Sequence, residues 1–348
     1  MTAKNITIGI DLGDRRHAVC VLSASGKILL EDLLVNDRAG LTIFAQRYPG
    51  ATIVMETGTH SPWVSRLFEA LGHKVHVANA RKLRAISTSA NKNDVEDARM
   101  LARLGRADPQ LLSPIKHRSE PTQRALVRMK VREALVRNRV STMNSVRFLL
   151  KSLGLMVPRG VKATAFVRQF RKLANATDTA LVEPLLQILD ALNERIKQLD
   201  RELELIADER YPATQRLRQI AGVGPLTALG FVLTIEDPGR FPQTRDVGAY
   251  LGLVPRRDQS GQTDKQLPIT KRGNVQLRCL LVNCAHYILG PFGPPSHLRE
   301  AGERIAARGG KSAKKRAVIA VARKLAVTLL ALWKSGAAYQ PQPHLQAA

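Results

Sequence analysis

The stretch Ile6-Thr-Ile-Gly-Ile-Asp11 decides the fold of the amino-terminal part of this chain. It is an apolar run that ends in an acid, which is typical of a buried strand with a polar residue at its carboxyl end. A second such run, Ala51-Thr-Ile-Val-Met-Glu56, follows, and Asp94 and Asp97 stand at the start of a predicted helix. Residues three apart share a helix face, so these two carboxylates are expected to point toward the same ion.

The four acids Asp11, Glu56, Asp94 and Asp97 fall where an RNase H-like nuclease places its metal ligands. Acids are scarce in this chain, which has 54 Lys and Arg against 29 Asp and Glu. A cluster of like charges is costly unless a cation neutralises it, and hard divalent cations take oxygen ligands. We therefore predict a Mg²⁺ site, which Mn²⁺ would also fill. Taken singly, each acid is more simply read as a cap, a turn or a surface residue.

The pattern around these acids predicts an α/β domain. Three strands with tight connections come first, and helices then alternate with strands, which favours a mixed sheet flanked by helices. The predicted strands span 5–12, 17–24, 27–35, 51–56 and 74–79, and the predicted helices span 38–48, 61–71 and 93–105.

Two long helices are predicted next. The helix over 121–153 is strongly basic, and we expect nucleic-acid contacts from Arg128, Arg132, Arg137 and Arg139. The helix over 178–208 carries apolar residues in a 4-3-4-3 spacing, the heptad pattern of a coiled coil. The spacing leaves two partners open. One is another subunit, and the other is the basic helix of the same chain, in an antiparallel hairpin.

The carboxy-terminal part holds two further candidate sites. Residues 217–229 read as a helix, a Gly-x-Gly turn at Gly222 and Gly224, and a second helix. This helix-hairpin-helix pattern offers free backbone N–H groups to a phosphate, although a plain helical hairpin has the same pattern. A polar loop with Ser260 follows the strand-like residues 250–254. A serine beside a glycine is usually a turn residue.

Lys271 and Arg272 are also candidates for binding a phosphate. The alternative is that they are ordinary solvated surface residues. The net charge of +25 and the pI of about 10.7 indicate a polyanionic partner, most simply DNA or RNA, with an anionic membrane surface as the weaker alternative. The three cysteines lack zinc-finger spacing, and the start of the chain lacks a signal peptide, so a cytoplasmic location is expected. Arg323 and Lys324 interrupt the most apolar late stretch, so no membrane span is expected.

Taken together, the motifs resemble the DEDD transposases of the insertion sequence 110 family, in particular its 1111 subgroup. The resemblance covers about residues 5–335. It rests on these motifs: Ile8-Gly-Ile-Asp11, Met55-Glu-Thr-Gly58, Asn91-Lys-Asn-Asp-Val-Glu-Asp-Ala98, Ile220-Ala-Gly-Val-Gly-Pro225, Tyr250-Leu-Gly-Leu-Val-Pro255, Gln259-Ser-Gly261 and Ile269-Thr-Lys-Arg-Gly-Asn274.

The resemblance implies three domains and a tail. These are an RNase H/RuvC-like DEDD domain over 1–118, a basic helical coiled-coil region over 119–210, a mainly helical transposase domain over 211–336, and a disordered tail over 337–348. It also implies that the acid tetrad holds Mg²⁺ and that Ser260 is a nucleophile forming a phosphoserine bond with DNA. Family members act as oligomers, here a homodimer or homotetramer, and are guided by a structured bridge RNA. Many relatives have a small polar residue where this chain has Gln259.

Three other functions compete with a serine- and metal-dependent recombinase. A RuvC-like nuclease would hydrolyse DNA with water and leave Ser260 structural. A nucleic-acid-binding protein with a decayed site would do no chemistry, which the intact tetrad argues against. A sugar-kinase-like ATPase also opens with Ile8-Gly-Ile-Asp-Leu-Gly13, but it needs further glycine-rich phosphate loops that the sequence lacks.

Overall fold

The computed structural model describes residues 6–83, 93–158, 160–260 and 263–342. The chain divides into two compact units, residues 1–118 and 119–348. No helix of the described residues is long and apolar enough to cross a membrane.

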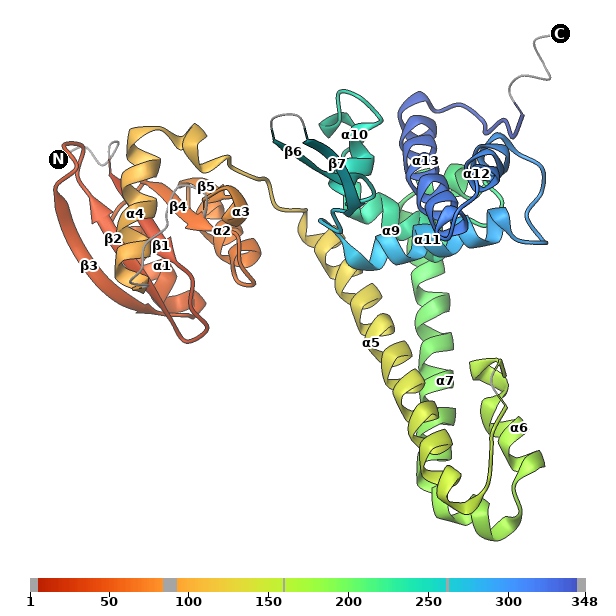
Figure 1. Ribbon diagram of the computed structural model, residues 1–348. Coiled ribbons are helices and arrows are strands. Elements are labelled where there is room, and N and C mark those ends of the chain that lie inside the picture. Colours follow the sequence, from red (N-terminus) through yellow and green to blue (C-terminus); the bar gives the residue numbers. More distant parts are fainter. Residues whose placement is uncertain (1–5, 84–92, 159, 261–262, 343–348) are drawn as a thin grey trace. The chain divides into compact units, whose positions relative to one another are not determined.

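The first unit is built on a five-stranded mixed sheet in the order β3-β2-β1-β4-β5 (Figure 1). β1 pairs antiparallel with β2 and parallel with β4, which fits an RNase H-like α/β domain. The predicted mixed sheet is therefore confirmed. The strands are β1 (Thr7–Asp11), β2 (Arg16–Leu22), β3 (Ile28–Val35), β4 (Thr52–Glu56) and β5 (Lys74–Ala78).

Helices cover both faces of this sheet, because alternate residues of β1 and β4 are apolar on both sides. Ile8, Ile10 and Met55 pack with α1 (Arg38–Gln46) and α2 (Ser61–Ala70) in one buried cluster. On the other face, the cores involve α4 (Asp94–Ala107), which packs on β1, β2 and β4. A short helix α3 (Ala80–Leu83) and a 3₁₀ turn (Pro109–Leu112) complete the unit.

The second unit begins with a long antiparallel hairpin of α5 (Glu120–Leu149) and α7 (Ala176–Arg210), with α6 (Phe166–Leu173) near its tip (Figure 1). The heptad residues Leu189, Ile196 and Leu203 are buried inside this chain. Leu203 belongs to a core shared by α5, α7 and α9 (Pro225–Ile235), so the hairpin and the carboxy-terminal helices share one interior. The heptad face of α7 therefore packs on α5 of the same chain, as in the antiparallel-hairpin alternative.

A helical bundle with one β-hairpin completes the second unit. Its largest core joins α9, α11 and α13. The sequence predicted a strand over 250–254, but Tyr250 ends a helix and the first strand starts at Pro255. The remaining elements are α8 (Ala213–Leu217), α10 (Asp246–Tyr250), β6 (Pro255–Ser260), β7 (Thr263–Ile269), α11 (Val275–Leu289), α12 (His297–Ala307) and α13 (Ala313–Ser335).

The first residues of the predicted tail pack against the bundle. Pro341 accepts a backbone hydrogen bond of 2.9 Å from His297, and Tyr339 donates its backbone N–H to Gln219 at 2.8 Å. Residues 343–348 lie outside the described part of the chain.

Candidate active site

The carboxyl ends of β1 and β4 carry two of the predicted acids side by side. The strands are parallel, with Gly9 opposite Val54 and Ile10 opposite Met55, so Asp11 and Glu56 come next in register. Side chains alternate between the faces of a strand. Val54 packs in a cluster with Leu101 of α4, so Glu56, two residues on, faces the α4 side.

Asp11 faces the same side because Gly9 does. A Cβ added to Gly9 would lie 2.0 Å from the backbone oxygen of Ala98 and 2.5 Å from the backbone nitrogen of Ala102. Only a glycine allows α4 to approach β1 this closely. Asp11 is two residues further, about 7 Å along the strand on the same face.

The direction of α4 brings the other two acids to the same edge. Its carboxy-terminal Arg106 donates to the backbone oxygen of Ala24 at 3.2 Å, beyond the end of β2 that pairs with Thr7. The helix therefore runs antiparallel to β1, and its first turn lies at the Asp11 end. Asp97 and Asp94 precede Ala98 by one and four residues, within about 6 Å along the helix axis.

The first turn of α4 is held by its own contacts. The side chain of Asn93 caps the helix by accepting from the Val95 N–H at 3.1 Å. Carboxylates near a helix amino terminus are favoured by the helix dipole, which gives Asp94 a structural role as well. Glu96 pairs with Arg99, which also donates to both carboxylate oxygens of Glu31 at 2.8 and 3.0 Å. As expected from its place between the two aspartates, Glu96 is engaged elsewhere.

The backbone thus gathers the tetrad at one sheet edge, and the side chains do not themselves form a ligand cluster. Within residues 6–83, 93–158, 160–260 and 263–342, no three His, Cys, Asp or Glu side chains lie close enough to hold a metal ion. Asp11, Glu56 and Asp97 are half-buried and Asp94 is exposed, so all four side chains are at least partly accessible to solvent. Oxygen ligands of this kind on one edge fit a hard divalent cation.

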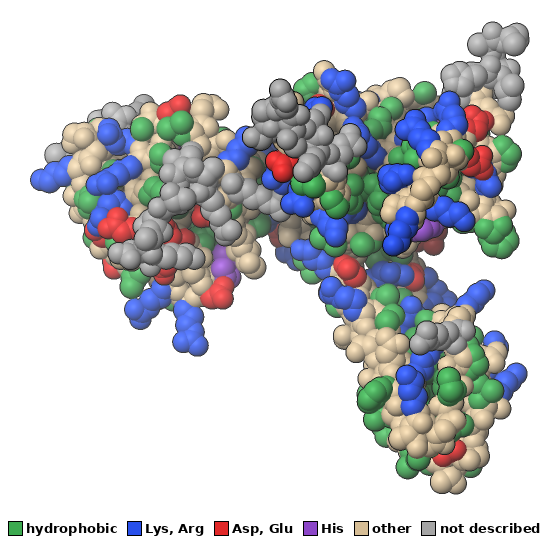
Figure 2. Space-filling view, in the orientation of Figure 1, with side chains coloured by type: hydrophobic (Ala, Val, Ile, Leu, Met, Phe, Trp, Pro, Cys, Tyr) green, Lys and Arg blue, Asp and Glu red, His purple; other side chains and the backbone are tan. Residues whose placement is uncertain are grey.

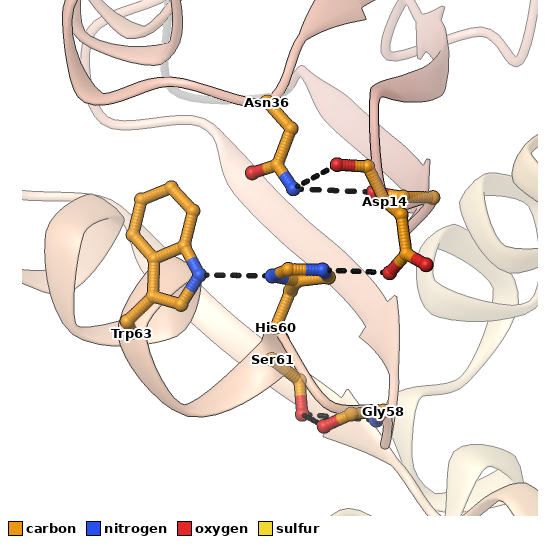
Figure 3. A network of polar contacts seen from close by, with 7 residues as sticks. Asp14, Asn36, Gly58, His60, Ser61 and Trp63 are labelled. Atoms are coloured by element: carbon orange, nitrogen blue, oxygen red, sulfur yellow. Dashed lines mark hydrogen bonds and ion pairs between the residues drawn. The ribbon is translucent and has the colours of Figure 1, made fainter.

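A polar network ties together the loops that follow the two strand-end acids (Figure 3). His60, after Glu56, places Nε2 3.0 Å from Oδ1 of Asp14, after Asp11. The indole of Trp63 donates to Nδ1 of His60 at 3.3 Å, so Nε2 carries the proton donated to Asp14. Asn36 donates to the backbone oxygen of Asp14 at 3.0 Å. Asp14 is a surface residue as predicted, with 95% of its side chain exposed, yet it helps to fix the spacing of these loops.

Ser260 is the last residue of β6, and its backbone lies opposite Thr263 of β7. The structure describes its backbone only, and Gly261 lies outside the described residues. The predicted polar loop is therefore a β-hairpin, with the serine at the end of its first strand. No described contact tests its predicted role as a nucleophile.

The loop with Lys271 and Arg272 is held in one conformation by close backbone packing. A Cβ on Gly252 would lie 2.3 Å from the backbone oxygen of Arg272. The buried Arg278 donates from one nitrogen to the backbone oxygens of Arg272 at 2.7 Å and of Leu251 at 3.0 Å. Lys271 takes a left-handed φ of 54°, which costs a non-glycine residue free energy and is often found at functional sites. Both basic side chains are exposed, as a phosphate contact requires.

The four predicted arginines of α5 differ in their surroundings. Arg132 pairs with Asp200 of α7, with Nε 2.5 Å from Oδ1. Arg139 donates to Asn193 of α7 at 3.0 Å, and burial lowers its pKa. These two side chains hold the hairpin together, because they flank its apolar seam. Arg128 and Arg137 are exposed and remain candidates for nucleic-acid contacts.

The Gly-x-Gly turn has a structural explanation at its first glycine. Gly222 has a φ of 90°, and a Cβ there would lie 2.6 Å from Cδ1 of Tyr287. Gly224 is exposed and precedes α9 without a side-chain cap. The preceding helix α8 has only five residues, shorter than a helix-hairpin-helix predicts.

Comparison with known proteins matches an amino-terminal segment and a carboxy-terminal segment of the chain to transposases. A family model described as "Transposase IS116/IS110/IS902 family" matches residues 214–297, and one for DEDD transposases of the IS110 type matches residues 8–154. The transposase for insertion sequence element IS1328 of Yersinia enterocolitica is 32% identical over 292 residues, which cover 81% of this chain and 83% of that protein.

Two further relatives extend the comparison. The transposase for insertion sequence element IS1111A of Coxiella burnetii is 27% identical, over 81% of this chain and 77% of that protein. The pilin gene-inverting protein of Moraxella bovis is 25% identical, over 97% of this chain and 98% of that protein.

Proposed function

Because this chain belongs to the IS116/IS110/IS902 family of insertion-sequence transposases, it acts on DNA, and we propose that it does so with an acid tetrad and a serine nucleophile. The observation that carries the proposal is the arrangement at the sheet edge. Two parallel strands end there in Asp11 and Glu56, and α4 brings Asp94 and Asp97 to the same edge. A sugar-kinase-like ATPase would need further glycine-rich phosphate loops, which the sequence lacks, and the net charge of +25 fits it poorly.

In this proposal the tetrad holds Mg²⁺, which Mn²⁺ would replace. Such an ion neutralises charge at phosphorus and activates a nucleophile. The oxygen of Ser260 would bond to phosphorus as the bond from phosphorus to one ester oxygen breaks. The serine proton would pass to that leaving oxygen, so the released strand ends in a hydroxyl. A phosphoserine bond preserves the energy of the phosphodiester for rejoining. The alternative is a RuvC-like nuclease in which water takes the place of Ser260.

The experiment compares three variants on DNA that carries an end of the element in which this gene lies. We expect Asp11→Asn to abolish cutting and to weaken Mn²⁺ binding measured by calorimetry. Ser260→Ala should abolish cutting and leave Mn²⁺ binding intact. Glu69→Gln, at an exposed acid of α2 in the same unit, is the matched control and should still cut.

A covalent protein–DNA product on a denaturing gel separates the serine from the water mechanism. The parent protein should form it, and Ser260→Ala should not. Cutting by Ser260→Ala at the parental rate, with no adduct in either protein, would leave the water-dependent nuclease as the function.

We propose a structured guide RNA as the second partner. The support is the net charge of +25, together with exposed Arg128 and Arg137 on a helix of 30 residues. Phosphate contacts of this kind give strong, salt-dependent affinity. The test is to sequence the RNA that copurifies with the protein; RNA without segments that match the ends of the element would contradict the proposal.

We also propose that the protein acts as a homodimer or homotetramer. The support is apolar surface near the tip of the α5–α7 hairpin, where Phe148 is 73% exposed and Met156 is 83% exposed. Exposed clusters of large apolar side chains are typical of contact surfaces. Light scattering that gives the mass of a monomer, with DNA and RNA bound, would contradict the proposal.

A further inference from the structure

A cavity of about 490 Å³ in the second unit is lined by three arginines. Arg256 and Arg257 come from the start of β6 and Arg323 comes from α13, with Val254 and Pro255 completing the wall. Figure 2 shows Lys and Arg side chains gathered over the region of α13 in this view. Neither the predicted site residues nor the core of the unit accounts for this cluster.

A β-bulge lies beside the two successive arginines that line this cavity. Neighbouring residues of a regular strand point to opposite faces. The pairing of β6 with β7 shifts between Pro255, opposite Ile269, and Arg257, opposite Gln266. A bulge of this kind places an extra residue in one strand and redirects its side chain. The extra residue is in β7, where Leu267 and Pro268 lie opposite the single Arg256, and the change in twist at this bulge accompanies the convergence of Arg256 and Arg257 on one cavity.

Arg323 joins them from a helix that is otherwise anchored in the core. Its neighbours Ala322 and Leu325 are fully buried, whereas Arg323 is exposed. Its side chain crosses α10 at Gly248, where an added Cβ would lie 3.0 Å from Cγ and 3.2 Å from Nε of the arginine. A glycine inside a helix costs about 1 kcal/mol relative to alanine. At this position it makes room for the arginine.

The chemistry of the cluster favours a phosphate. Guanidinium groups bind phosphate oxygens through paired N–H donors, and like charges held together are relieved by an anion. Among the described residues, Arg256 and Arg323 form no ion pair with an acid. The cavity opens to solvent between charged side chains, which suits a backbone phosphate of a polymer.

We propose that Arg256 and Arg323, with the charge of Arg257 beside them, bind a backbone phosphate of the DNA strand, away from the bond that is cut. Ser260 lies four residues after Arg256 along β6, a distance of about 13 Å at the usual rise of a strand. The bound phosphate therefore belongs to a neighbouring nucleotide and positions the strand along β6. Its position relative to the cut rests on the proposed role of Ser260, whereas the phosphate contact itself does not.

Arg323→Gln tests the contact, because the side chain lies on the surface of a long helix. Arg304→Gln on α12 is the matched control, since Arg304 is also exposed and forms no ion pair with a described residue. Binding to a short labelled DNA duplex is measured as a function of salt concentration. Loss of one phosphate contact should reduce the slope of log affinity against log salt by up to about 0.9. We expect this for Arg323→Gln and no change for Arg304→Gln.

Methylphosphonate substitution, one position at a time, then locates the phosphate on a cleavable element-end duplex. One neutral linkage near the cut should weaken binding by the parent protein. The same linkage should not weaken binding by Arg323→Gln any further. Equal slopes for the two variants would overturn the proposal, and so would a change seen only with an RNA duplex. A reduced slope in a protein that forms no DNA adduct would support the contact and contradict the serine mechanism, so the two failures are distinguishable.

Discussion

The approach of α4 to β1 at Gly9 gives the sharpest prediction. In Gly9→Ala the new Cβ would lie 2.0 Å from the backbone oxygen of Ala98, whereas an ordinary contact needs at least 3.4 Å. The helix must therefore move by about 1.4 Å, because backbone atoms have no other rotamer to adopt. Overpacking of a core costs about 1–3 kcal/mol, and a clash with backbone lies at the upper end of that range. We expect the first unit to lose about 3 kcal/mol of unfolding free energy.

Urea unfolding followed by tryptophan fluorescence measures this loss. The chain has two tryptophans, so a Trp333→Phe background leaves Trp63, beside the core of the first unit, as the reporter. With a slope of about 2 kcal/mol per molar urea, the midpoint should fall by about 1.5 M. Gly58→Ala is the matched control, because nothing lies within 4 Å of its added Cβ.

The same substitution tests the candidate site. Asp97 directly precedes Ala98, so a shift of about 1.4 Å in α4 displaces this carboxylate from Asp11. Misplacement of about 1 Å commonly costs a factor of about 100 in rate. Under conditions in which Gly9→Ala is folded, DNA cutting should therefore fall about 100-fold, and Gly58→Ala should cut normally. Equal midpoints and equal rates for the two variants would refute the close packing of α4 on β1 and the convergence inferred from it.

Three further predictions concern stability. Burial, with smaller effects of Arg66 and Arg118, lowers the pKa of His117 to about 4, so its folded form stays neutral while the unfolded chain takes a proton near pH 6.5. The stability that depends on neutral His117 is complete above pH 6.5 and is lost as the pH falls from 6.5 to 4. The unfolding free energy derived from urea midpoints should therefore fall by about 1–3 kcal/mol over that range, and by less in His117→Gln. Arg278→Met leaves two backbone oxygens without their charged donor and should cost about 3 kcal/mol in urea unfolding of a Trp63→Phe background, where Trp333 reports on the second unit. An unchanged midpoint would refute the role of Arg278 in holding the loop. Leu203→Ala, in the shared core, should cost about 3 kcal/mol, and Leu205→Ala, which is 58% exposed, less than about 0.5; equal losses would contradict the packing of α7.

The positions of Asp11 and Glu56 at neighbouring strand ends could be predicted because they depend on local patterns. An apolar run that ends in an acid fixes the strand end, and parallel pairing then aligns Asp11 with Glu56. The direction of α4 was not predictable from spacing alone. It depends on Gly9 and on Arg106, whose partner Ala24 lies 82 residues earlier in the chain. Side-chain positions at such an edge depend on the balance of carboxylate repulsion and cation binding, which residue order does not encode.

The carboxy-terminal hairpin was missed for a different reason. Residues 250–254 are apolar enough to read as a strand, but they fold into the end of α10 and a turn whose Gly252 packs against the backbone of Arg272. The true strand, Pro255–Ser260, is polar and has no apolar alternation, and its residues 255–259 are exposed. The pattern rule detects strands with a buried face, whereas in the described part of the chain β6 pairs with β7 alone.

The heptad pattern of α7 shows the limit of periodicity as a guide to partners. A 3.5-residue spacing indicates that one face of a helix is covered, but it does not indicate which helix covers it. Here the competing partner is in the same chain. α5, with 30 residues, is nearly as long as α7, with 35, and the connecting segment lets them meet antiparallel. A tethered partner has a high effective concentration, so it occupies the seam before a second subunit does. Any contact between subunits must therefore use surface that this seam leaves exposed, such as Phe148 and Met156.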